Sequence, residues 1–269
     1  MTAVLAAAGV TILTFAATSS AQPVRAVVQP TAVQAAPAPH DDTDTVYVTG
    51  KAKDGSTTVT IYDPAEGVSP DQLRTMLRRS GVTGVLAKGV QPPTTQPGQK
   101  SAQATAPQAC LSYGSAREWC NHRWSYGAFN DPQVYFLDHT SSRWPVTNAV
   151  ADWYKAVGID AYYRWYTAGC PSGRHCVNVY NGNYGASGWY GLTTWNPGTQ
   201  GPVTVKLNDH YSLTANQHRT IACHELGHAL SLAHATSTSS CMYSGTYISL
   251  HPSSNDYSLL PRIYPKPGT

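Results

Sequence analysis

Residues 223–243 read CHELGHALSLAHATSTSSCMY. Within this stretch, His224 and His228 are four residues apart, so on a helix their imidazoles lie on one face, about 6 Å apart. Two imidazoles at that spacing can share one Zn²⁺ ion, each at about 2.0–2.1 Å. Glu225 follows the first histidine and is placed to take a proton from the water that the metal makes acidic. The stretch therefore predicts a metal-dependent hydrolytic site.

His234 extends this motif but cannot belong to the same straight helix. It lies ten residues after His224, which corresponds to about 1000° of helical rotation. We therefore expect the helix to end near Ser231, and the chain to bend there so that His234 completes a set of three ligands.

Composition limits the class of protein. The chain has 269 residues, enough for one large domain with additional segments. Only 12% of the residues are charged, about half the usual share, and the net charge is +3. No cluster of lysine and arginine alternates with aromatic residues, so we expect no nucleic-acid partner.

The N-terminus indicates export. Residues 3–17 are apolar and are followed by small residues suited to cleavage, so we predict a signal peptide over residues 1–21. No lysine or arginine precedes the apolar run, which is unusual for a signal. The alternative, a membrane anchor, is disfavoured because the run is short for a span, so no stable anchor is expected. The sequence predicts a secreted, extracellular monomer.

Six cysteines, all after residue 109, indicate disulfides in an exported chain. Fifteen pairings are possible, but local spacing suggests two short-range bridges. The two remaining cysteines would then form the third bridge. The suggested pairs are Cys110–Cys120, Cys170–Cys176 and Cys223–Cys241. The alternative is a cysteine-ligated zinc, which is disfavoured because no C-x₂-C spacing is present.

Composition also divides the chain into segments. Residues 22–39 are rich in proline and alanine and read as a linker, and residues 91–108 read as a second, Pro-rich linker and a site of proteolysis. Between them, residues 40–90 form a small unit with a helix and alternating strands. Residues 109–269 hold all 7 tryptophans and 9 of the 10 histidines, so they form the main domain.

Alternation and helical periodicity predict the elements of these segments. In the small unit we expect strands at 45–49, 58–62 and 82–90 and a helix at 69–79. In the main domain we expect strands at 133–138, 161–166, 189–195 and 202–208, and helices at 145–157 and 214–230. This order predicts a layer of helices packed against a sheet.

The motif and two later features resemble a known family. HELGHALSLAH at 224–234 resembles the HExxHxxGxxH signature of the metzincin zinc endopeptidases. Met242 and Tyr243 are similar to the Met-turn of the matrixin branch, and Asp256 to Tyr264 resembles the last matrixin helix. The resemblance implies an α+β fold: a twisted mixed sheet, two long helices, one of them carrying HExxH, a Met-turn, a short C-terminal helix, and a small N-terminal α+β prosegment.

The resemblance also implies roles for individual residues. His224, His228 and His234 match the zinc ligands and Glu225 matches the general base. Met242 matches the residue that forms an apolar floor beneath the metal. Candidate substrate-wall residues are Tyr243 and Tyr247, and the strand at 202–208 would be the sheet edge to which a peptide adds. One catalytic zinc ion is implied. Calcium is left open, because the loop at 181–188 lacks the family's Asp and His ligands.

Two departures from the family pattern affect this site. Ser231 stands where the family has glycine, and a left-handed serine costs on the order of 1 kcal/mol, which a Cys223–Cys241 bridge could offset. We expect the bend to persist with His234 slightly displaced. No cysteine lies in residues 1–109, so a thiolate cannot cap the zinc. If the N-terminal segment blocks the site, the candidate groups are those of His40, Asp41, Asp42 and Asp44, without a preference among them.

Together these features predict a secreted zinc-dependent endopeptidase that acts on peptides or proteins. Two alternatives stay open. One is a catalytically inactive secreted binding protein on the same scaffold. The other is an HExxH peptidase of another clan that uses Asp256 as its third ligand.

Overall fold

The computed structural model describes residues 44–93, 110–120, 122–196, 203–245 and 248–266. The segments predicted as a signal peptide and first linker lie outside these ranges, as does most of the second linker. Tyr247 also lies outside them.

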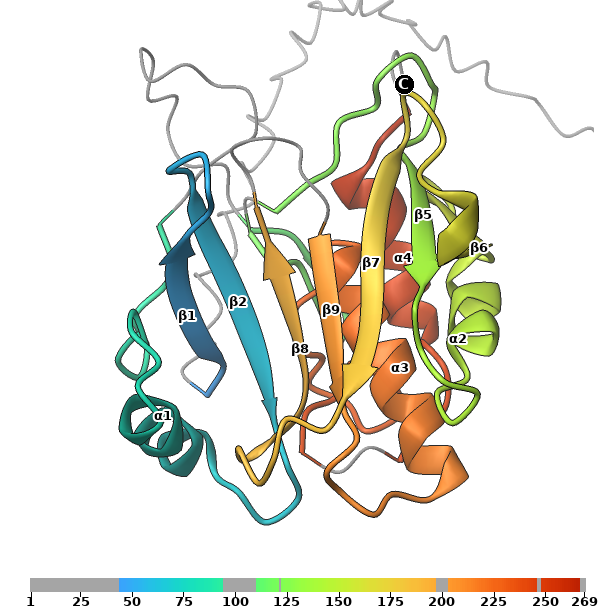
Figure 1. Cartoon of the computed structure of the whole chain (residues 1–269). Coiled ribbons are helices and arrows are strands. Elements are labelled where there is room, and N and C mark those ends of the chain that lie inside the picture. Colours follow the sequence, from blue (N-terminus) through green and yellow to red (C-terminus); the bar gives the residue numbers. More distant parts are fainter. Residues whose placement is uncertain (1–43, 94–109, 121, 197–202, 246–247, 267–269) are drawn as a thin grey trace, which may run out of the picture. The chain divides into compact units, whose positions relative to one another are not determined.

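A seven-stranded mixed sheet organises the fold (Figure 1). Its strands are β1 (Val46–Lys51), β2 (Thr57–Pro64), β5 (Gln133–Asp138), β6 (Asp160–Trp165), β7 (His175–Gly182), β8 (Trp189–Trp195) and β9 (Val203–Asn208). They are arranged in the order β1-β2-β8-β9-β7-β5-β6. The pairs from β9 to β6 are parallel, whereas β1, β2, β8 and β9 pair antiparallel. A separate two-stranded ribbon, β3 (Ser112–Tyr113) and β4 (Ala116–Arg117), was not expected from the sequence.

Within the described ranges, four α-helices accompany the strands: α1 (Pro70–Arg79), α2 (Val146–Trp153), α3 (Ala215–Ala229) and α4 (Ser254–Ile263). The main core contains strand residues such as Phe136 and Val205 together with Leu226 of α3. Trp153 of α2 joins this core, and its Nε1–H donates to the carbonyl of Cys223 on α3 at 2.9 Å. The fold is thus the mixed α+β arrangement expected from the sequence, with two helices packed on one face of the sheet.

A smaller core covers the other face where β1, β2 and β8 meet. Leu73 and Leu77 of α1 pack there against Val46 and Leu192. The helix begins as its sequence predicts, since Ser69 and Gln72 form a reciprocal capping box and Pro70 stands at the first helical position. The α1 helix therefore anchors the β1–β2 hairpin to the sheet.

Two expectations about the strands were wrong. The strand at 202–208, now β9, is not an edge, because it lies between β8 and β7. In the sheet, β9 lies next to β7 although β8 precedes it in sequence. The β8 strand pairs with the other side of β9, and β2 pairs with β8. The expected strand at 82–90 reduces to an isolated bridge between Val85 and Val48.

The structure contains three disulfides, Cys110–Cys120, Cys170–Cys176 and Cys223–Cys241, which is the pairing that the sequence spacing suggests. None of the described helices combines the length and the apolar character needed to cross a membrane.

Candidate metal centre

The α3 helix supplies most of the site. Thr214 caps its N-terminus in a capping box with Gln217. Three of its side chains, those of His224, Glu225 and His228, are fully buried at 0% exposure. Polar groups buried to this extent require partners or a ligand, since an unpaired buried charge is strongly disfavoured. The sequence therefore places three chemically active groups inside the protein.

The chain bends after α3 at Ser231, whose φ is 76°. Ser231 N–H donates to the carbonyl of His228, and Leu232 N–H donates to that of Gly227, each at 3.1 Å. This pattern is a Schellman motif, which normally uses glycine at the left-handed position. The bend expected from the histidine spacing therefore forms in spite of the serine.

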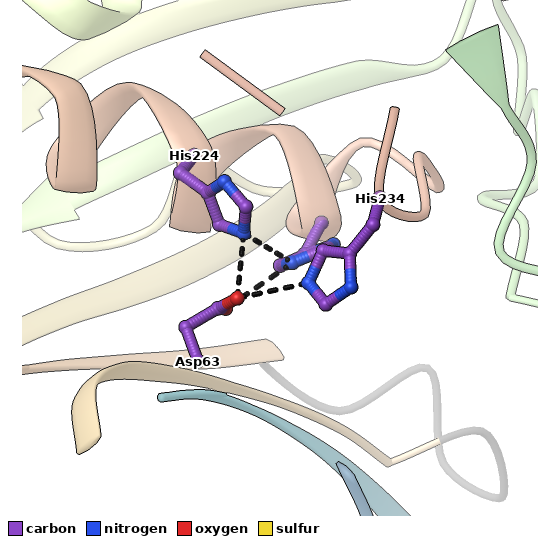
Figure 2. Close-up of side chains that lie close together, drawn as sticks. Asp63, His224 and His234 are labelled. Atoms are coloured by element: carbon purple, nitrogen blue, oxygen red, sulfur yellow. Dashed lines mark hydrogen bonds and ion pairs between the residues drawn. The ribbon is translucent and has the colours of Figure 1, made fainter. Parts of the chain in front are cut away.

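The bend brings His234 into a cluster with His224 and His228. The Oδ1 atom of Asp63 lies 2.8 Å from Nε2 of His224 and 2.8 Å from Nε2 of His234. The Oδ2 atom of Asp63 lies 3.3 Å from Nε2 of His228. Figure 2 shows the Asp63 carboxylate opposite the rings of His224 and His234. One ligand atom from each of the four residues lies within 4.8 Å of the others.

Asp63 was not among the groups that the sequence suggested for blocking the site. It is the residue next to last in β2 and is fully buried. Of the suggested groups, Asp44 is exposed and pairs with Lys88 at 3.4 Å. His40, Asp41 and Asp42 lie outside the described residues. The acid that reaches the histidines thus comes from the end of a strand.

The outer ring nitrogens of the histidines show which inner atoms can bind a metal. Nδ1 of His224 donates to the carbonyl of Cys241, and Nδ1 of His228 to that of Leu232, each at 2.7 Å. A carbonyl can only accept, so both Nδ1 atoms carry the proton and both Nε2 atoms present lone pairs to the centre. In His234, Nδ1 lies 3.0 Å from the hydroxyl of Thr45, which precedes β1. Such outer partners are typical of metal-bound histidines.

The inner atoms fit a zinc ion. The Nε2 atoms of His224 and His228 face each other at 3.0 Å. Two lone pairs at that distance repel each other unless a cation lies between them. Zn²⁺ bound tetrahedrally at about 2.0 Å places its ligand atoms about 3.3 Å apart. The distances from the Asp63 carboxylate to the three imidazoles, 2.8–3.3 Å, and the 3.0 Å between His224 and His228 are close to this value. Nitrogen and oxygen are ligand atoms that zinc accepts.

The electrostatics of the buried groups agree with this geometry. Burial is the main cause that lowers the pKa of His228, to about 4, so its imidazole is neutral at neutral pH. Burial by itself would raise the pKa of the Asp63 carboxyl, but its interactions with His224, His234 and His228 outweigh burial and hold that pKa well below its usual value. Neutral imidazoles and an ionised carboxylate are the forms that bind metals.

Glu225 lies beside the cluster and is held by β8. The hydroxyl of Thr193 donates to Glu225 Oε2 at 2.7 Å. A Cβ atom built at Gly191 would lie only 2.1 Å from Glu225 Oε1, so the absence of a side chain at Gly191 makes room for this carboxylate. Burial first, and then the neighbouring charge of Asp63, raise the pKa of Glu225 well above its usual value.

The other predicted site residues lie around the turn after His234. Met242 is fully buried, and a Cβ atom at Gly227 would lie 2.2 Å from its Sδ, so Met242 packs directly against α3 next to His228. Tyr243 follows it and is half-buried. Asp256 caps α4: its Oδ2 accepts from the N–H of Ser253 at 2.6 Å and from the hydroxyl of Ser240 at 2.5 Å. Asp256 is not part of the four-residue cluster.

Comparison with known proteins then decides the family. The family model described as Matrixin matches residues 81–262, which is more than half of the chain. The protein belongs to the matrixin family. A comparison with curated proteins gave no match. Membership in the matrixin family supports a zinc metallopeptidase that acts on peptides or proteins, and the cluster of three histidines with Asp63 is its candidate metal site.

Three residues of this matrixin site were missed at the level of sequence. Gly191 and Thr193 lie in a strand that was expected at 189–195, but no spacing links them to Glu225, 32 residues after Thr193. Asp63 directly follows the alternating run that was expected to end at Tyr62. An acid at the end of a strand was a weak signal, and its meaning depends on where that strand pairs.

Proposed function

We propose that the protein is a secreted zinc-dependent endopeptidase in which three imidazoles hold the metal and Glu225 is the general base. The observation that carries this proposal is the convergence of the inward-facing Nε2 atoms of His224, His228 and His234. The three disulfides fit an extracellular protein, because such bridges persist in oxidising compartments.

A zinc ion at this position supplies Lewis acidity, which polarises a peptide carbonyl and brings the pKa of a water molecule close to 7. Glu225 takes up the proton of the attacking water and passes it to the leaving amine. Thr193 holds one oxygen of the Glu225 carboxyl, and the space above Gly191 admits the other. The backbone carbonyls of Cys241 and Leu232 fix the orientation of two imidazoles.

The test compares Glu225→Gln with the parent protein. We expect the variant to keep one zinc per chain and to lose cleavage of casein by at least about 100-fold, since proton transfer typically contributes 10²–10⁴-fold. Glu66→Gln, at an exposed glutamate, is the matched control and should cleave normally. The samples are the secreted protein, with its N-terminus determined by sequencing, with and without phenanthroline.

Cleavage that persists in Glu225→Gln, or that resists chelation of the metal, would contradict this function. Loss of zinc on substitution of His234 would separate this site from one that uses Asp256 as its third ligand. The contacts of Asp256 with Ser240 and Ser253 give no support to that alternative.

A further inference from the structure

The β1–β2 hairpin occupies the sheet edge next to the metal cluster. β2 pairs with β8 in antiparallel register, from Val59 opposite Trp195 to Pro64 opposite Trp189. In the sheet formed by residues of the main domain alone, β8 would be the edge, since its other neighbour is β9. An extended peptide adds to such an edge through main-chain hydrogen bonds. Figure 1 shows β2, in cyan, lying along β8.

The register of β2 also sets the position of Asp63. Asp63 pairs with Gly191, the residue over which the Glu225 carboxyl lies. The pairing becomes irregular between Asp63 and Pro64, where β2 ends. The carboxylate of Asp63 is therefore directed to the three Nε2 atoms at 2.8–3.3 Å, which is where a fourth ligand of a tetrahedral metal belongs.

A second contact of the same hairpin reaches the cluster from the start of β1. The hydroxyl of Thr45 and Nδ1 of His234 are hydrogen-bonded at 3.0 Å. The carbonyl of Thr45 accepts from the guanidinium of Arg74 on α1, at 2.7 Å, and Arg74 is buried. The α1 helix thereby fixes Thr45, and Thr45 helps to orient His234.

The contacts of Asp63 with the three histidines leave no open coordination position at the metal site. Catalytic zinc keeps one coordination position open, whereas a zinc ion with four protein ligands is the structural type. Asp63, His224 and His228 have no exposed surface. His234 keeps 13% of its side chain exposed, but Asp63 holds the position that an attacking water needs, and the hairpin occupies the strand edge that a peptide would use.

We propose that the β1–β2 hairpin is an inhibitory segment built into this chain: it fills the peptide-binding edge of β8 and caps the metal with Asp63, so that the full chain is latent until the hairpin is displaced. This inference rests on the proposed function, because a latent state requires an active one. The rival is a permanent hairpin, since Tyr47, Val59 and Ile61 belong to the main core. In that case the four-ligand site is structural and never opens.

The test uses the full chain with Co²⁺ bound in place of zinc, and azide as a small probe of an open coordination position. Asp63→Ala is compared with the parent protein and with Asp54→Ala, an exposed acid in the turn of the same hairpin. We expect the visible spectrum of the parent and of Asp54→Ala to be unchanged by azide. Asp63→Ala should respond saturably, with an apparent Kd at least tenfold below the highest azide concentration that leaves the parent spectrum unchanged.

Cleavage of casein by the same samples, shown intact by mass spectrometry, gives the second readout. We expect Asp63→Ala to cleave at least tenfold faster than the parent. Asp63→Asn, which keeps the shape of the side chain but not its charge, should change both readouts in the same direction and guards against misfolding of the alanine variant.

The outcomes separate the two proposals. Azide binding or casein cleavage by the intact parent that equals that of Asp63→Ala would overturn the latent state. So would an Asp63→Ala protein that holds Co²⁺ but responds to neither azide nor casein. Absence of Co²⁺ from the three histidines in every variant would instead refute the metal site itself, and with it the proposed function.

Discussion

Ser231 combines an unfavourable backbone conformation with favourable hydrogen bonds of its side chain. A left-handed φ, here 76°, is unfavourable for serine. The hydroxyl of Ser231, however, donates to the carbonyl of His122 and accepts from the hydroxyl of Tyr264, which lies 2.5 Å away. Tyr264 in turn accepts from the N–H of Trp124 at 3.2 Å. The bend could be predicted from the histidine spacing. Its hydroxyl partners could not, because they lie 109 and 33 residues away.

Substitutions at Ser231 separate these two effects. Ser231→Gly removes the strain of the left-handed backbone, because glycine adopts this conformation freely, whereas Ser231→Ala keeps that strain. Both substitutions remove the hydrogen bonds of the buried hydroxyl. We expect both variants to be less stable than the parent, with the free energy of unfolding of the alanine variant about 1 kcal/mol below that of the glycine variant. Urea denaturation with the disulfides intact measures this difference. An alanine variant as stable as the glycine variant would show that the left-handed backbone carries no penalty.

The buried side chain of His122 should make the free energy of unfolding depend on pH. It is buried and stacked on Trp119, with the ring centroids 4.2 Å apart, and burial is the main cause that lowers its pKa to about 4. Between that value and the unfolded pKa of about 6.5, the unfolded chain binds more protons. The stability that His122 contributes is therefore fully present above pH 6.5 and is lost as the pH falls; the loss reaches about 3 kcal/mol near pH 4.

We expect His122→Gln to be less sensitive to pH over that window. The measurement is the free energy of unfolding of both proteins at several pH values between 4.5 and 7.5. The curve of the variant should be flatter, whatever its absolute stability. Parallel curves would mean that His122 is protonated equally in the folded and unfolded states.

Among the elements, β8 links the sheet to Glu225, the proposed general base. Its Gly191 makes room for the Glu225 carboxyl, and its Thr193 holds it. The strand itself could be predicted from its residues. Its place in the sheet could not, because the sequence contains no sign that β8 crosses outside β9. That order also decides which strand receives β2.

Gly191→Ala tests this role. The new methyl group would lie 2.1 Å from Glu225 Oε1 and would displace the carboxyl. The strand pairing of β8 and the hydrogen bonds of the three histidines should be unchanged. Added to the Asp63→Ala protein, in which the site is expected to be open, Gly191→Ala should leave zinc at one per chain and lower casein cleavage about 100-fold, as for a catalytic group misplaced by about 1 Å. The control is Gly182→Ala, where the nearest atom lies 3.4 Å away. Normal cleavage by Gly191→Ala would contradict the assigned position of Glu225.

For the whole molecule, the sequence predicts the parts better than their assembly. The HExxH helix, its third histidine, the strands of the main domain and the disulfide pairs follow from local spacing. The joining of β2 to β8 does not, because it pairs residues more than 120 positions apart. Asp63 enters the site only through that register, so no motif could have identified it.

The central claim is a metal held by three histidines and, in the full chain, by Asp63. Anomalous diffraction at the zinc edge from crystals of the full chain tests it directly. We expect a peak at about 2.0–2.2 Å from Nε2 of His224, His228 and His234 and from a carboxylate oxygen of Asp63. A zinc-containing crystal with no peak among these atoms, or with a peak held by other ligands, would contradict the claim.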